Sequence, residues 1–93
     1  MQHAGCPYFD LDVTGKTPVS VLNEYAMRVL RCPIEFVVTT QEDPVNPYLT
    51  AIVCDGIVIA RGAYINKKMS RQVASRKALS ILAPLLDLSL IHI

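Results

Sequence analysis

An Asp-Gly pair between two apolar runs constrains the fold of this chain more than any other local feature. Asp55-Gly56 separates residues 48–54 from residues 57–63, and both runs are rich in apolar residues that favour strands. An Asp-Gly pair readily adopts the positive φ angles that a two-residue hairpin turn requires. We therefore predict two antiparallel strands joined at Asp55-Gly56.

A further strand and a helix are predicted before this hairpin. Residues 35–40 are rich in Phe, Val and Thr and indicate a strand, which is followed by a loop at residues 41–47. Thr17-Pro18 is a helix start, because a hydroxyl residue suits the N-cap and proline suits the first helical position. Pro33 is expected to stop this helix. Its apolar face comprises Val21, Leu22, Tyr25, Ala26, Val29 and Leu30.

A second helix is predicted from the N-cap Asn66 to about Leu82. Its apolar face comprises Ser70, Ala74, Ala78, Ile81 and Leu82. Small residues on this face allow a close approach to a sheet. The order α-β-β-β-α predicts an α+β fold, in which a three-stranded antiparallel sheet carries two helices packed on one face.

The 93 residues are enough for one small domain. We expect an irregular N-terminal arm at residues 1–15, the domain at residues 16–84 and a tail at residues 85–93. The end of the tail, residues 88–93, resembles the translation of an adaptor sequence that contaminates some assemblies, and we treat it as a sequencing artefact. The alternative is a short apolar extension.

The residue types offer little for catalysis or metal binding. The chain has three cysteines without a C-x-x-C pair and only two histidines, so we expect no metal, no cofactor and an intracellular location. The common catalytic motifs are missing, and the acids are scattered. No apolar run approaches the ~20 residues of a membrane span, so we expect no membrane partner.

The charge is distributed unevenly along the chain. Six cations and no acid lie within residues 61–77, whereas the other 76 residues carry three cations and eight acids. Lys67, Lys68 and Arg71 crowd the start of the second predicted helix, where the helix dipole favours acids instead. We call these three residues the cationic fork. Because the fork goes against the preference of the helix dipole, it indicates a binding site for an anionic polymer. The alternative is a solvated helix face.

Three features of the chain belong together: a helix with Leu-Asn-Glu-Tyr at residues 22–25, three strands, and Lys-Lys-Met-Ser-Arg at residues 67–71. Together they resemble a double-stranded RNA-binding domain. The resemblance covers about residues 16–84. Finer features, including Gly15-Lys16-Thr17 and the Glu24-Tyr25 pair, resemble the RNA-binding subunits of Microprocessor-type complexes.

The resemblance implies RNA-binding roles for Asn23, Glu24, Asn46, Lys67, Lys68 and Arg71. The first two match a polar pair that reaches ribose 2′-hydroxyls in a minor groove, and the basic cluster matches one that spans a major groove through phosphates. Asn46 lies in the loop that usually makes a second minor-groove contact. This loop departs from the family pattern, because it has no Gly or His and carries Glu42 and Asp43 upstream.

The expected function is noncatalytic binding of A-form, hairpin RNA by its shape, phosphates and 2′-hydroxyls. The resemblance further implies primary microRNA processing in the nucleus, with an RNase III nuclease subunit as a partner. The alternative is a protein–protein interaction or dimerisation domain of the same fold with weak or no RNA binding. A ribosomal-type α/β protein is a third reading, disfavoured because such chains are usually more basic.

Overall fold

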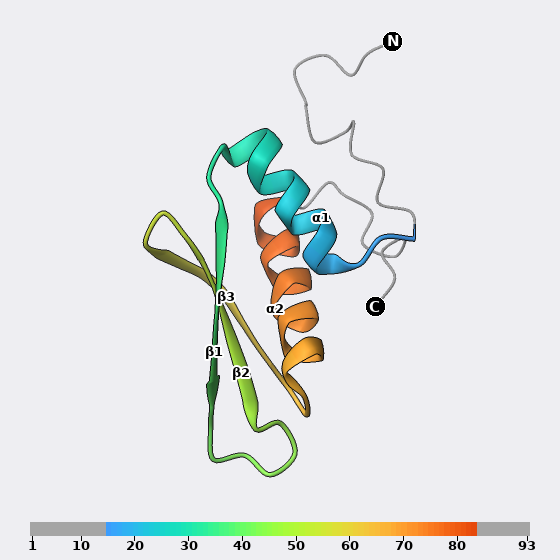
Figure 1. Ribbon diagram of the computed structural model, residues 1–93, viewed down its shortest axis with the longest axis vertical. Helices are drawn as coiled ribbons and strands as arrows, with labels where there is room; N and C mark the ends of the chain where they lie inside the picture. Colours follow the sequence, from blue (N-terminus) through green and yellow to red (C-terminus); the bar gives the residue numbers. More distant parts are fainter. Residues whose placement is uncertain (1–14, 84–93) are drawn as a thin grey trace.

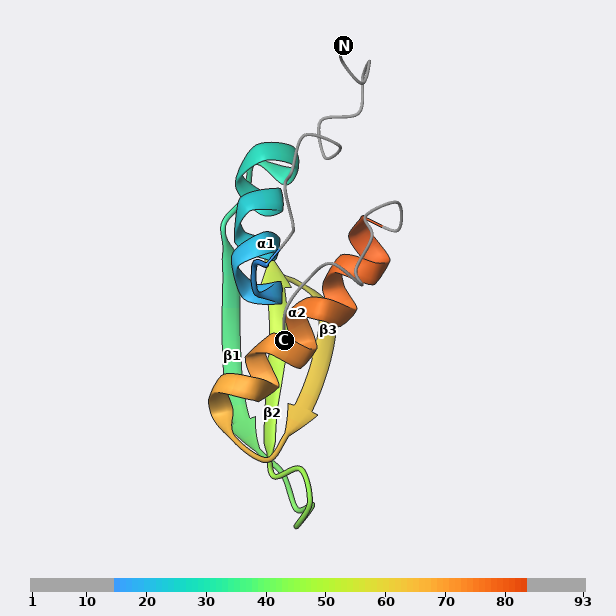
Figure 2. The same ribbon diagram turned by 90° about the vertical axis from the view of Figure 1, so that its right-hand side faces the viewer.

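The computed structural model describes residues 15–83 as a helix layer packed on a sheet (Figure 1). The elements are α1 (Pro18–Tyr25), η2 (Ala26–Leu30), β1 (Ile34–Thr40), β2 (Tyr48–Cys54), β3 (Ile57–Tyr64) and α2 (Lys67–Leu82). The strands form one antiparallel sheet in the order β1-β2-β3, and both helices cover the same face of it (Figure 2). The predicted fold is therefore confirmed.

Parts of the predicted domain division lie outside the described residues. These parts are residues 1–14 of the arm, residue 84 and the tail at residues 85–93. Within the described part of the chain, no helix combines the length and the apolar character that crossing a membrane requires.

The first helix begins and ends close to the predicted positions. The side chain of Thr17 accepts a hydrogen bond from the backbone N–H of Ser20 at 3.3 Å, which confirms the N-cap. The final turn, η2, has π-helical hydrogen bonding and was not predicted. Arg31 then adopts a left-handed conformation with φ of 58°, so the helix ends at Leu30, three residues before Pro33.

The hairpin and the start of α2 form as expected. Asp55 and Gly56 have φ angles of 54° and 76°, which confirms the tight turn between β2 and β3. The register of these strands shifts between Ile52 and Val53, a β-bulge near the turn. Asn66 caps α2 through its side chain, which accepts the backbone N–H of Met69 at 2.8 Å.

The core lies between the sheet and the two helices, and α2 approaches the sheet very closely. A Cβ atom built on Gly62 of β3 would lie 2.4 Å from the backbone nitrogen of Ala74. Only glycine therefore lets α2 pack at this distance. The fully or nearly buried apolar residues are Val21, Leu22, Tyr25, Ala26, Ile52, Ala60, Ala74, Ala78, Leu79 and Ala83.

One core prediction for α2 is wrong. Ile81 was assigned to the apolar face but is 60% exposed, whereas Leu79 is fully buried. The buried face of α2 extends toward Ser75 and Leu79 because the helix packs against α1 as well as the sheet. Ile81 lies at the other margin of that face, and it is left in solvent.

Candidate nucleic-acid interface

The basic cluster lies at the N-terminal end of α2, as the sequence predicts. The side chains of Lys67 and Lys68 are exposed and that of Arg71 is half-buried. Within residues 15–83, no ion pair joins any of these three cations to an acid. The first turn of α2 therefore presents three positive charges next to backbone N–H groups that also favour an anion.

A buried hydroxyl pair holds this first turn against the sheet. The hydroxyls of Thr50 on β2 and Ser70 on α2 are 2.6 Å apart, and both residues are fully buried. The Ser70 hydroxyl also donates to the backbone carbonyl of Lys67 at 2.9 Å. This network fixes the backbone that carries Lys67 in relation to the central strand.

Tyr48 orients one of the cations. The ammonium of Lys67 lies 5.9 Å from the centre of the Tyr48 ring, which is at the start of β2. This is within the range of a cation–π interaction. Because β2 begins where the loop at residues 41–47 ends, the contact draws Lys67 toward that loop.

On α1, Asn23 is exposed, whereas Glu24 is already paired. The Glu24 carboxylate accepts a hydrogen bond from the ammonium of Lys16 at 2.9 Å, and Arg28 lies 3.6 Å away one helical turn later. Two cations offset the charge of this carboxylate and leave it with spare acceptor capacity. A neutralised acceptor of this kind suits a 2′-hydroxyl donor better than an isolated carboxylate beside phosphates.

Two hydrogen bonds fix α1 in relation to α2. The backbone N–H of Val19 donates to the side-chain oxygen of Gln72 at 3.1 Å. The Tyr25 hydroxyl donates to the backbone carbonyl of Leu82 at 2.9 Å. Since Gln72 directly follows Arg71, the first of these bonds ties α1 to the basic cluster.

The loop at residues 41–47 is organised by its own polar groups. The Asp43 carboxylate accepts the backbone N–H groups of Val45 and Asn46 at 2.9 and 3.2 Å. The side-chain amide of Gln41 donates to the backbone carbonyl of Asn46 at 2.8 Å. Asn46 is half-buried and Glu42 is exposed. Asp43 thus serves the loop structure, and Glu42 remains as an outward-facing negative charge.

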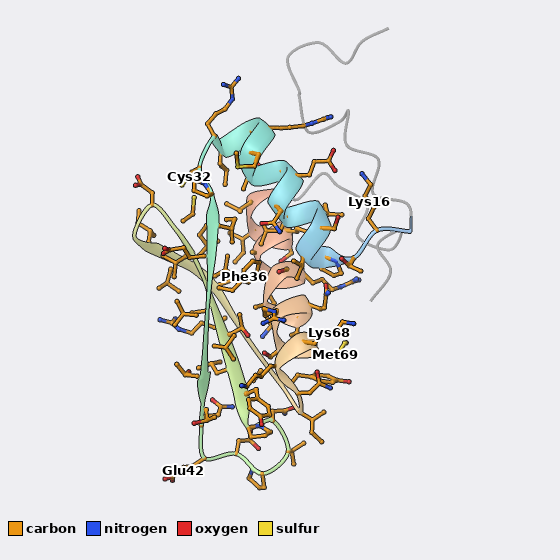
Figure 3. All side chains as sticks on the ribbon, in the orientation of Figure 1. Lys16, Cys32, Phe36, Glu42, Lys68 and Met69 are labelled. Carbon is orange, nitrogen blue, oxygen red and sulfur yellow. The ribbon has the colours of Figure 1, made fainter. Side chains whose placement is uncertain are left out.

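The predicted site residues come from three segments that follow one another along the molecule. In Figures 1 and 2, the start of α2 lies between α1 and the loop joining β1 to β2. Figure 3 shows Lys16, Lys68 and Glu42 in this order along the long axis. The arrangement places a basic segment between two polar ones. Such a surface can bridge two phosphate rows while its ends reach adjacent grooves.

Sequence reasoning missed three residues that shape this surface. Arg28 was signalled by its spacing, since it is four residues after Glu24 and on the same helix face. The contacts of Lys16 and Tyr48 had no sequence signal, because each joins segments that are apart in the chain. Within the described residues, no three His, Cys, Asp or Glu side chains gather where they could hold a metal ion.

Comparison with known proteins agrees with this geometry. The profile of the family described as "Double-stranded RNA binding motif" matches residues 18–82, from the start of α1 to the end of α2. The chain belongs to this family. The match includes all six predicted site residues, and the double-stranded RNA binding motif is a noncatalytic binding module.

A curated protein similar to this chain is the Microprocessor complex subunit DGCR8 of Bos taurus. It is 32% identical to the chain over 76 residues, which cover 82% of the chain and 10% of the relative. The chain thus spans about a tenth of the length of this relative. The match confirms the resemblance to the RNA-binding subunits of Microprocessor-type complexes, which include Partner of Drosha.

Proposed function

We propose that this chain binds double-stranded RNA through α1, the loop at residues 41–47 and the start of α2. The observation that carries the proposal is the cationic fork of Lys67, Lys68 and Arg71, which has no acidic partner within the described residues. An A-form duplex has a deep, narrow major groove that brings two phosphate rows close together. A fork of fixed cations at a helix start is complementary to that groove.

The polar residues on either side of the fork supply the discrimination between RNA and DNA. Asn23 and the paired Glu24 on α1 contact 2′-hydroxyls in one minor groove, and Asn46 contacts the next one. The loop contact is the weakest of the three, because the side chain of Glu42 repels phosphates. Since all these contacts go to sugar and phosphate, recognition is largely independent of sequence.

The similarity to a Microprocessor complex subunit extends the proposal to the class of RNA. The target is the hairpin stem of a primary microRNA transcript, and the setting is a nuclear complex whose RNase III subunit does the cutting. In this setting the chain contributes binding and no catalysis. This part of the proposal is supported by the relative in Bos taurus and by the noncatalytic character of the family.

The proposal is tested by titrating the chain against an RNA duplex of about 20 base pairs, since a domain of this family spans ~16. The same sequence as a DNA duplex is titrated in parallel, at two salt concentrations. We expect binding to RNA, much weaker binding to DNA and a loss of about tenfold or more in Lys67→Ala/Lys68→Ala.

Lys77→Ala is the matched control, because Lys77 is an exposed cation of α2 beyond the fork. It should change the affinity far less than the double variant does. Equal losses in both would mean that only total charge matters and would remove the fork from the proposal. If the folded chain does not bind RNA at all, the RNA-binding hypothesis fails. The hypothesis of a protein–protein interaction domain then takes its place.

A further inference from the structure

Two tyrosines are neighbours at the end of the sheet next to the cationic fork. Tyr48, the first residue of β2, is paired in register with Tyr64, the last residue of β3. Directly opposite residues of antiparallel strands have Cβ atoms about 4.5–5.5 Å apart, so their side chains lie next to each other. The loop joining β1 to β2 and the start of α2 are at the same end of the sheet (Figure 1).

Both tyrosines belong to the face of the sheet that carries the helices. Thr50, two positions after Tyr48, is hydrogen-bonded to α2 through its hydroxyl. Gly62, two positions before Tyr64, lies so close to α2 that it leaves no room for a Cβ atom. Alternate residues of a strand point to the same face, so the two tyrosines share the face of Thr50 and Gly62. They therefore lie on the same side of the sheet as the fork.

The ring of Tyr64 is left accessible although helices pack on this face. Tyr64 is 39% exposed, and the next residue, Ile65, is 60% exposed. Tyr48 is half-buried, and the ammonium of Lys67 lies over its ring, 5.9 Å from the centre. Tyr64 is thus the ring of the pair that remains open to a ligand, with a cation of the fork nearby.

The chemistry of these surroundings favours an RNA base as that ligand. Residues 61–77 contain six cations and no acid, so the ring lies where a polyanion is attracted. The bases of a perfect duplex keep their faces stacked on one another, whereas an unpaired base offers a π-face to an aromatic side chain. A basic surface for the backbone beside an aromatic ring for a base is the usual combination in proteins that bind single-stranded nucleic acid.

We propose that Tyr64, with Tyr48 beside it, is a stacking site for an unpaired RNA base next to the duplex contact. The inference rests on the proposed function, because the fork must hold the phosphates of the stem. A stem with a bulged nucleotide then makes two kinds of contact. Its backbone binds the fork, and its extruded base stacks on the tyrosine ring. The chain therefore prefers a stem with an unpaired base to a perfect duplex.

The test compares three RNA duplexes of about 20 base pairs that differ at one central position. The first is fully paired, the second carries one bulged adenosine, and the third carries a bulged nucleotide that lacks its base. We expect the bulged adenosine to strengthen binding by about fivefold over the paired duplex. The abasic bulge should lack this gain, because it interrupts the backbone in the same way but offers no ring to stack. Equal gains from both bulges would overturn the proposal.

Three variants assign the preference to the ring. Tyr64→Ala should remove the preference for the bulged adenosine and leave the affinity for the paired duplex within about twofold. Tyr64→Phe keeps the ring and should keep the preference. Ile81→Ala is the matched control and should also keep it, because Ile81 is an exposed apolar residue near the other end of α2. If Tyr64→Ala weakens binding to all three RNAs equally, the ring contacts the backbone and not a base.

A crosslinking experiment supplies a second measurement on the unaltered chain. With 5-iodouridine as the bulged nucleotide, irradiation should link the RNA to Tyr64 or Tyr48, as mapped by mass spectrometry. A crosslink elsewhere, or none, would count against the stacking site. If the chain binds the paired duplex but shows no preference for the bulged one, the stacking site fails and the RNA-binding function stands. If it binds none of the three RNAs, both fail.

Discussion

The two helices lie side by side on one face of the sheet, yet their cations have different surroundings. On α1, the carboxylate of Glu24 pairs with both Lys16 and Arg28. On α2, Lys67 and Lys68 have no acidic partner within residues 15–83. The same type of side chain therefore has two roles. Near α1 it neutralises an acceptor, and at the start of α2 it is left for an external anion.

The backbone supports this difference. The first turn of α2 is held by the Asn66 cap and by the buried hydroxyls of Thr50 and Ser70, so its cations project from a fixed base. Because no acid lies within four residues of Lys67, Lys68 or Arg71 in the sequence, no local ion pair can form at this first turn. Cations that are fixed and unpaired gain more free energy on binding a polyanion than cations that must first break an ion pair.

The largest expected effect comes from a substitution that prevents the close packing of α2 against β3. Gly62→Ala places a Cβ atom 2.4 Å from the backbone of Ala74, and both segments must move apart. We expect a loss of about 3 kcal/mol in the free energy of unfolding, measured by denaturant titration. Gly56→Ala is the control, because Gly56 has a positive φ of 76° but open space around it. Gly56→Ala should lower the free energy of unfolding by only about 1 kcal/mol. An equal loss in both variants would show that α2 does not pack tightly against Gly62.

The charge contrast between the helices is tested by Lys68→Ala and Lys16→Ala. If Lys68 contacts a phosphate, its loss should weaken RNA binding by about tenfold and reduce the slope of log K against log salt by about 1. Lys16→Ala removes a partner of Glu24 and should leave that slope unchanged. Titrations at four salt concentrations measure both slopes. An equal reduction in both variants would break the contrast, since Lys16 would then be a phosphate contact too.

Two buried serines of α2, Ser70 and Ser75, test how much a hydrogen-bonded hydroxyl contributes to stability. Ser70→Ala removes a bonded hydroxyl and leaves that of Thr50 buried, so we expect a loss of about 1–2 kcal/mol in the free energy of unfolding. Ser75→Ala removes a buried hydroxyl that has no hydrogen-bond partner among the described residues, so a gain of about 1 kcal/mol is expected. Thermal melting of both variants separates the cases. A loss in both would mean that the hydroxyl of Ser75 is bonded in solution.

The smallest expected effect is on RNA binding and concerns the loop at residues 41–47. Glu42→Gln removes an exposed negative charge next to the proposed second groove contact and should strengthen RNA binding by about twofold. Glu35→Gln is the control, because Glu35 is also exposed but lies at the other end of β1. Fluorescence anisotropy at low salt resolves a change of this size. If Glu42→Gln weakens binding, the loop carboxylate is itself a contact.

The fold and most of the site chemistry could be predicted because they depend on near neighbours in the chain. Thr17 and Asn66 cap helices that begin at the next residue, and Asp55-Gly56 closes a turn between adjacent strands. The exposure of Lys67 and Lys68 also follows from their position on a helix. The error at Ile81 arose because helical spacing gives the direction of a side chain but not which other elements pack around it.

The sequence by itself determined the order of the elements, the hairpin, the helix starts and the uneven charge, because each of these depends on residues within one turn or strand. Tertiary structure decided three contacts between distant segments: Gly62 against Ala74, Tyr48 against Lys67, and Thr50 against Ser70. Such contacts depend on strand register and on the distance between helix and sheet. These are set by the packing of the whole core, which no local pattern encodes.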